Sequence, residues 1–202
     1  MVAKRSRVSE GLFMPVEQYL ALDEATDGKY EYLHGYVFMV RPPSSAYLGN
    51  AAVVEDMAGG SPAHGALAAR AITVLNNALE DSPCIAYTSD TKAQLAEDVY
   101  VYPDVLVSCE EPDHKSLTSP TVIIEVLSPN TEKRDRYDKI DSYKKIASVQ
   151  EYLLIGSERK EIIIHRRETD WRPYHYRSGD LVELRSLGIS IPFEDFYHKV
   201  KL

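Results

Sequence analysis

The sequence predicts an α/β domain whose mixed central sheet is flanked by helices, with an N-terminal hairpin before it and a C-terminal β-meander after it. The segment TVIIEVL (121–127) is apolar on both faces except at Glu125, a pattern typical of a central strand covered on both sides. Helical and strand-like periods follow one another in the order helix, three strands, helix, strand. This order favours a sheet with helices packed against it.

The first part of the chain predicts a short helix and a hairpin. Residues 14–22 (MPVEQYLAL) have helical character. Residues 30–40 alternate around His34-Gly35, where Gly35 supplies the positive φ that a tight turn needs. The basic start, residues 1–10, is expected to be disordered. Residues 41–60 are rich in Pro, Ser and Gly and predict a loop.

A capped helix and a strand-rich second half follow. Ser61 is a suitable N-cap, Pro62 fits the first turn, and apolar residues recur at helical spacing until Asp81-Ser82-Pro83 ends the helix. The later elements are expected as strands 85–95, 99–108 and 121–127, a polar helix 132–146, strands 152–156 and 161–167 joined by a hairpin, a meander through 171–187, and a short helix 193–197.

Length and composition limit the class of protein. The 202 residues, 44% of them hydrophobic, fit a single domain spanning 1–202. No apolar run is long enough to cross a membrane. Cys84 and Cys109 predict neither a disulfide framework nor a zinc site, so a reducing cytoplasm is the expected location. The net charge of −8 argues mildly against obligate high-affinity nucleic-acid binding, but not against an enzyme.

Two carboxylates in the predicted sheet indicate a metal site. Asp104 follows Pro103 in one strand-like run, and Glu125 lies in the next. A carboxylate on a central strand is costly to bury unless a partner compensates its charge. Two carboxylates on neighbouring strands, completed by waters and a phosphate oxygen, suit Mg²⁺ or Mn²⁺. Such a site can polarise a phosphate and activate a water molecule.

Phosphate chemistry also needs a cation near the developing charge. Leu127, two residues after Glu125, cannot supply it. Lys139 and Tyr143 are four residues apart on the polar helix and share one helical face. Because that helix begins just after the Glu125 strand, it can bring Lys139 back over the end of the strand.

Each of these residues also has a structural interpretation. Asp104 alone is typical of a Pro-Asp bend, Glu125 could pair with a nearby Lys or Arg, and Tyr143 is more often a core residue. Lys139 could be an exposed partner of Asp135 at i,i+4. Charged residues elsewhere have the same two interpretations, as site groups or as solvated surface: Asp90, Lys92, Lys133, Arg134 and Arg136.

The chain resembles the Uma-two family of restriction-type endonucleases, within the PD-(D/E)XK nuclease superfamily. The resemblance runs through YEYLHGYVF, MAGGSPAHGALAAR, YVYPDVLVSC, IIEVLSPNTEKRDRYDKIDSYKKI and LGISIPFEDFY. It implies a restriction-endonuclease-like fold, Asp104 and Glu125 as metal ligands, and Lys139 as a catalytic lysine moved from strand to helix. It also implies site positions for Glu31 and His64.

Two features depart from the family pattern. His34-Gly35 stands where the hairpin usually carries Asp-Gly, and residues 41–56 look like a loop insertion. The resemblance implies a Mg²⁺- or Mn²⁺-dependent endonuclease that acts on DNA as a homodimer. The alternative is a catalytically inactive nuclease-fold protein that binds nucleic acid or a protein partner.

Overall fold

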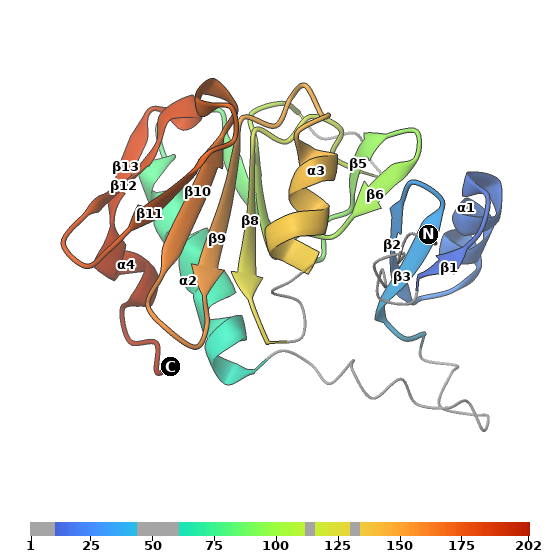
Figure 1. The fold of residues 1–202 in the computed structure, drawn as a ribbon, viewed down its shortest axis with the longest axis horizontal. Helices are drawn as coiled ribbons and strands as arrows, with labels where there is room; N and C mark the ends of the chain where they lie inside the picture. Colours follow the sequence, from blue (N-terminus) through green and yellow to red (C-terminus); the bar gives the residue numbers. More distant parts are fainter. Residues whose placement is uncertain (1–10, 44–60, 112–115, 130–133) are drawn as a thin grey trace, which may run out of the picture.

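The computed structural model describes residues 11–43, 61–111, 116–129 and 134–202. The predicted disorder of residues 1–10 lies outside the described residues, as does the predicted loop insertion from residue 44 onward. Three sheets make up the described fold, and the helices pack around them (Figure 1).

A six-stranded mixed sheet forms the centre, as the sequence predicts. Its strand order is β11-β10-β9-β8-β7-β4, and β8 and β9 run parallel while the other neighbours are antiparallel. All six residues of β8 are buried, which agrees with its apolar pattern on both faces. The strands are β4 (Ile85–Thr88), β7 (Val105–Ser108), β8 (Val122–Leu127), β9 (Glu151–Gly156), β10 (Ile162–Arg166) and β11 (Pro173–Tyr176).

Helix α2 (Pro62–Ala78) covers one face of this sheet, where the sequence predicts a capped helix. The Ser61 hydroxyl accepts a hydrogen bond from the backbone N–H of His64 at 3.2 Å, which satisfies one free donor of the first turn. Leu67, Ala71 and Leu75 are fully buried against the sheet. The cap therefore fixes where His64 lies, in the first turn of the helix.

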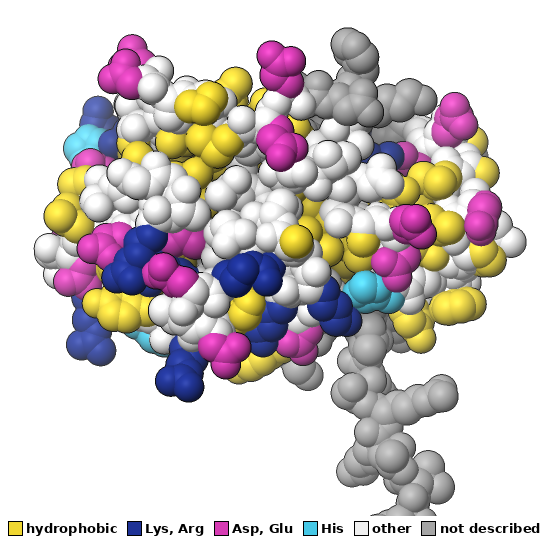
Figure 2. Space-filling model, turned by 90° about the horizontal axis from the view of Figure 1, so that it is seen from above, with side chains coloured by type: hydrophobic (Ala, Val, Ile, Leu, Met, Phe, Trp, Pro, Cys, Tyr) yellow, Lys and Arg dark blue, Asp and Glu magenta, His cyan; other side chains and the backbone are white. Residues whose placement is uncertain are grey.

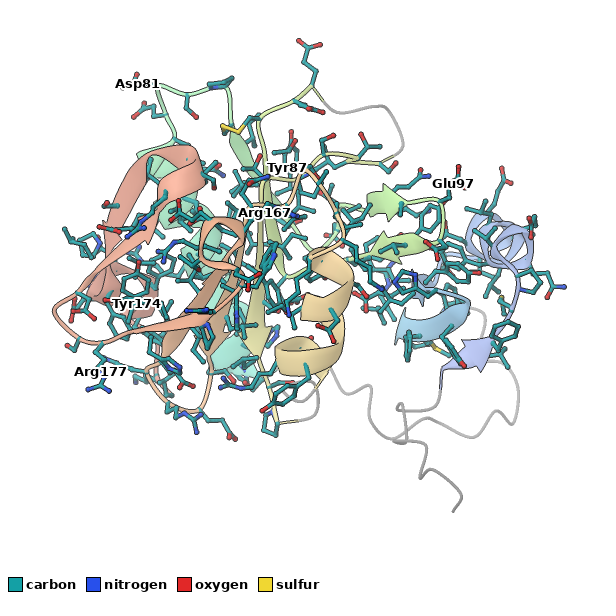
Figure 3. The ribbon with its side chains drawn as sticks, turned by 45° about the horizontal axis from the view of Figure 1, so that its top comes forward. Asp81, Tyr87, Glu97, Arg167, Tyr174 and Arg177 are labelled. Carbon is teal, nitrogen blue, oxygen red and sulfur yellow. A yellow bond between two sulfur atoms is a disulfide. The ribbon has the colours of Figure 1, made fainter. Side chains whose placement is uncertain are left out.

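The polar helix covers the opposite face, but its form differs from the prediction. Its described part is a π-helical segment, η3 (Arg134–Lys139), continued by one α-helical turn, α3 (Ile140–Tyr143). The helix ends three residues before the predicted end, because the Arg167 guanidinium donates to the carbonyls of Lys144 and Ile146 and closes the last turn. Figure 3 shows Arg167 beside the upper end of this helix.

A second, five-stranded antiparallel sheet lies beside the first and was not predicted. Residues 85–95 and 99–108, each expected to form one strand, are both broken, and each contributes one strand to either sheet. Pro103 cannot donate a ladder hydrogen bond, and the chain bends at Asp104. The strands, in spatial order, are β1 (Leu12–Phe13), β3 (Tyr36–Arg41), β2 (Lys29–Leu33), β6 (Val99–Val101) and β5 (Ala93–Ala96).

The predicted hairpin forms strands β2 and β3 of this second sheet, and the predicted first helix packs against it. His34 and Gly35 both have positive φ (49° and 92°), as a two-residue turn of this kind requires. Helix α1 (Val16–Ala25) starts after Pro15, two residues later than predicted. Its Tyr19 stacks on Tyr32 at 4.8 Å between ring centroids, which anchors the helix to the sheet.

The meander predicted through 171–187 is present only in part, because its second strand belongs to a separate ribbon. Strands β9, β10 and β11 pair in sequence, whereas β12 (Leu181–Leu184) pairs only with β13 (Ile189–Pro192). Helix α4 (Phe193–Tyr197) has the predicted bounds. A buried ion pair between Glu151 and Arg166 at 3.0 Å ties the ribbon to the central sheet, since Glu151 also accepts hydrogen bonds from the Ser186 backbone and hydroxyl.

The two cysteines correct a prediction, because Cys84 and Cys109 form a disulfide. They lie one position beyond the last paired residues of β4 and β7, Ile85 and Ser108, so the antiparallel ladder places them side by side. Figure 3 shows the bond as a yellow link near Asp81. Their separation of 25 residues gave no sign of this pairing in the sequence. None of the helices in the described residues is long and apolar enough to span a membrane.

Reduction of this disulfide is expected to lower the free energy of unfolding by about 3 kcal/mol, because the bond closes a loop in the unfolded chain. Urea unfolding with and without dithiothreitol measures the difference. The Cys84→Ser/Cys109→Ser double variant should unfold identically under both conditions. An equal midpoint for the native protein with and without reductant would contradict this expectation.

Candidate active site

The five residues singled out in the sequence come together from five separate elements. Glu31 is on β2, His64 is in the first turn of α2, and Asp104 is at the bend between β6 and β7. Glu125 is on β8, and Lys139 ends η3. Contacts link Lys139 to Glu125 and Glu31, Asp104 to Glu125, and His64 to Asp104. The helices α2 and α3 lie on opposite faces of the central sheet (Figure 1).

Glu125 and Lys139 form a buried ion pair at the centre of the group. Lys139 Nζ lies 2.7 Å from Glu125 Oε1, and the two side chains are 4% and 5% exposed. The Tyr143 hydroxyl donates to the same oxygen at 3.4 Å. Lys139 and Tyr143 therefore share one helical face directed at Glu125, as the sequence predicts. Tyr143 is also a fully buried core residue.

Asp104 connects this ion pair to the helix on the other face. Its carboxylate Oδ2 accepts a hydrogen bond from the backbone N–H of Val126 at 2.8 Å and lies 3.2 Å from His64 Nε2. Its own backbone N–H donates to Glu125 Oε2 at 3.4 Å. The bend expected of a Pro-Asp pair is present, and it places the carboxylate of Asp104 beside β8.

Two further carboxylates surround the lysine. Glu31 Oε1 lies 3.3 Å from Lys139 Nζ and accepts a hydrogen bond from the backbone N–H of Tyr102. Asp135 Oδ1 lies 3.5 Å from Lys139 Nζ. That oxygen is buried and, among the described residues, has no partner that meets hydrogen-bond geometry. The sequence did not predict Asp135 as a site residue.

The signal for Asp135 is its i,i+4 spacing from Lys139, which leaves an exposed ion pair as the structural alternative to a catalytic Lys139. The structure excludes that alternative, because Asp135 and Lys139 are both almost fully buried. The wider π-helical turn carries both residues on the side that faces the sheet. Its backbone is anchored there by the Tyr152 hydroxyl, which donates to the Asp135 carbonyl at 2.9 Å. Such turns often occur at functional sites.

Burial and crowding shift the pKa values of this group. Burial raises the pKa of Glu125 to about 8, against the lowering effect of Lys139 and with the repulsion of neighbouring carboxylates. Burial alone would lower the pKa of Lys139, but Glu125 and Glu31 reverse this and hold it well above its usual value. The hydrogen bond with Asp104 raises the pKa of His64, partly opposed by burial.

The charge of the group suits a divalent cation. The group brings four carboxylates together around the Lys139 ammonium and the His64 imidazole. In the described part of the chain, no three His, Cys, Asp or Glu side chains are grouped closely enough to enclose a metal by themselves. Mg²⁺ and Mn²⁺ keep several waters and accept one or two carboxylates, and Asp104 and Glu125 are ligands of that type.

The other charged candidates have structural partners outside the group. Asp90 pairs with Lys29, and Lys92 pairs with Asp23. The Arg136 guanidinium binds the Glu161 carboxylate at 2.8 Å. Side chains of Lys133 and Arg134 lie outside what the structure describes. Thus the sequence candidates divide into a converging group and separate surface pairs.

Comparisons with known proteins assign the chain to a family. The sequence model of the Uma2 family, described as "Putative restriction endonuclease", matches residues 48–194. Two uncharacterized Synechocystis proteins, slr1290 and sll1609, are 33% and 30% identical over 187 and 144 residues. These alignments cover 90% and 68% of this chain, and 90% and 72% of the relatives.

A solved structure shares the fold. It is the crystal structure of "a putative nuclease belonging to DUF820" from Anabaena variabilis, with a TM-score of 0.69 and 18% identity. The match covers 91% of this chain and 97% of that chain. The predicted fold class, a restriction-endonuclease-like mixed sheet flanked by helices, is confirmed by this likeness.

Proposed function

Because this chain belongs to the Uma2 family, we propose that it is a metal-dependent endonuclease that hydrolyses phosphodiester bonds in DNA. The observation that carries the proposal is the convergence of Asp104, Glu125 and Lys139 from three different elements on one buried group. Burying several carboxylates around one lysine is costly for a purely structural contact. A catalytic requirement for those charges explains why they are buried together.

Asp104 and Glu125 would hold the cation, Mg²⁺ or Mn²⁺. When bound, the cation supplies polarisation of the phosphate and a lower pKa for the attacking water. The backbone N–H of Val126 and the His64 ring orient the Asp104 carboxylate, and Tyr143 orients that of Glu125. Such supporting hydrogen bonds keep the oxygens in place as the substrate arrives.

Lys139 would act on the substrate directly. Its ammonium keeps its proton, because the surrounding carboxylates favour the charged form. An ammonium held by buried partners is already oriented, so it can stabilise the charge that develops on a phosphate oxygen without reorganisation. Glu31 and Asp135 also lie within 3.5 Å of the Lys139 ammonium and so limit where that charge can be placed.

One observation favours the alternative of a non-catalytic nucleic-acid- or protein-binding module. The Lys139 ammonium already compensates Glu125 at 2.7 Å, so a structural ion pair alone would satisfy that carboxylate. In that case Mn²⁺ should not bind in a manner that depends on Glu125. We expect the active form to be a homodimer, since a duplex offers two strands to cut; light scattering tests the assembly.

Plasmid DNA cleavage tests the proposed function. With Mg²⁺ or Mn²⁺, the native protein is expected to nick or linearise supercoiled plasmid, and Asp104→Asn is expected to lose this activity about 100-fold or more, because a cation ligand becomes neutral. Asp81→Asn is the matched control, since Asp81 is exposed at the far end of α2 (Figure 3). Equal cleavage by native protein and Asp104→Asn would refute the assignment.

A further inference from the structure

A small hollow lies beside the proposed active site. It is open to solvent, has a cavity volume of about 20 Å³, and is bordered by the end of β8, by Arg136 of η3 and by the turn between β9 and β10. Leu127, Ser128 and Pro129 form its wall on the β8 side. The hollow has no role in the function proposed above.

Two guanidinium groups meet one oxygen atom at this hollow. Arg136 Nη2 donates to Glu161 Oε2 at 2.8 Å, and Arg159 donates to the same oxygen through Nε and Nη2 at 3.1 and 3.0 Å. An oxyanion held between two planar guanidinium groups is also how proteins bind phosphate. Glu161 therefore occupies the position that a phosphate oxygen would take.

The hollow lies on the same face of the sheet as the catalytic lysine. Glu125 and Leu127 are two residues apart on β8, so their side chains project from one face, about 7 Å apart along the strand. Arg136 precedes Lys139 by three residues on η3. The hollow and Lys139 therefore lie along the same strand and the same helix, so one DNA strand that reaches the lysine would also pass the hollow.

The distribution of charge also calls for such a contact. The chain is acidic overall, with a net charge of −8, and its site is a group of carboxylates. Seen from above, the Lys and Arg side chains lie mostly over the part of the molecule formed by the C-terminal strands and α3, with Asp and Glu side chains among them (Figure 2). The end formed by the N-terminal sheet shows mainly acidic and hydrophobic side chains.

We propose that Arg136 and Arg159 form a subsite for a backbone phosphate of DNA next to the scissile one, with Glu161 as the counter-ion that the phosphate displaces. This proposal rests on the proposed function. Glu158 and Glu161 both border the hollow, so the two guanidinium groups are balanced when DNA is absent. The Arg159 side chain is 68% exposed and can turn toward a ligand, whereas Arg136 is 18% exposed and fixed in the wall.

If Glu161 and a DNA phosphate compete for the two arginines, removing the charge of Glu161 and removing that of Arg159 should change the affinity for DNA in opposite directions. Binding of a short fluorescein-labelled DNA duplex is measured by anisotropy with Mg²⁺, in an Asp104→Asn background that does not cleave. Glu161→Gln is expected to tighten binding about threefold or more, because a competing charge is removed. Arg159→Gln is expected to weaken it about five- to tenfold and to reduce the salt slope by about one.

Controls separate this subsite from a purely structural role and from the proposed function itself. Arg177→Gln is the matched control, since Arg177 is exposed on the far side of the C-terminal sheet from α3 (Figure 3). If Glu161→Gln does not tighten binding and Arg159→Gln binds like the control, the pair is only a clamp and the proposal is wrong, while plasmid cleavage by native protein would still support the nuclease. If inorganic phosphate at equal ionic strength displaces the duplex equally from the Asp104→Asn protein and from the Asp104→Asn/Arg159→Gln protein, the subsite is likewise refuted.

Discussion

The Lys139→Met variant is expected to be about 3–5 kcal/mol less stable than the native protein and to cleave plasmid DNA about 1,000-fold more slowly. Removing one partner of a buried ion pair leaves the other charge uncompensated, and here Glu125, Glu31 and Asp135 all lose their cation. The catalytic loss follows because a preoriented charge near the phosphate is removed. Urea unfolding and single-turnover cleavage measure the two effects.

The pH dependence of this variant adds a second readout. Without Lys139 the pKa values of the remaining carboxylates should rise further, since the lysine is what lowers that of Glu125. The stability loss should therefore be smaller at pH 5, where these groups take up protons, than at pH 8. Lys145→Met, which changes an exposed lysine just after the same helix, is the control. A Lys139→Met protein with native stability and cleavage would exclude the role assigned to the lysine.

The Glu125→Gln variant is expected to bind Mn²⁺ about 100-fold more weakly than the native protein, because the ligand loses its charge but keeps its shape. The pKa of Glu125 is raised to about 8, so near neutral pH the folded protein without metal retains a proton on this group. Cation binding must displace it. Calorimetry in buffers of different ionisation enthalpy should therefore show release of about one proton at pH 7.

The same shift fixes the sign of the stability change with pH. The pKa of Glu125 is 4.5 in its ordinary state and about 8 when folded, so between these values the folded state binds the extra proton. In the absence of metal, the contribution of this group to the free energy of unfolding therefore falls as the pH rises from the lower to the higher of these pKa values. Glu97→Gln, at an exposed turn (Figure 3), serves as control. Proton release of equal size in Glu125→Gln would show that another group is responsible.

The central elements of the fold and site could be predicted because local patterns determine them. Glu125 is the only charge in an apolar strand, and that contrast identifies both the strand and its unusual residue. Ser61 and Pro62 mark the start of α2, and so place His64. In each case the free-energy cost of burying a charge or an unpaired N–H leaves few structures that the segment can adopt.

The features that were missed depend on contacts between distant parts of the chain. The residues 85–95 and 99–108 have strand propensity throughout, but periodicity does not say which strand each half will join. The disulfide of Cys84 and Cys109 follows from that pairing, so it was hidden for the same reason. Burial of Asp135 depends on a π-helical turn, for which spacing alone gives no signal.

The chain leaves the five-stranded sheet and enters the six-stranded one at the bend of Pro103 and Asp104. The site therefore spans the junction between the two sheets. Glu31 belongs to the first sheet, whereas Asp104 and Glu125 are fixed by the second. Glu31 also precedes residues 48–194, the part that the family sequence model matches. Separating the two sheets would remove Glu31 from Lys139 and leave the pair of proposed cation ligands together. A substrate that changes the separation of the two sheets would therefore change the contact between Glu31 and Lys139. The positions of the two carboxylates proposed to bind the metal would stay the same.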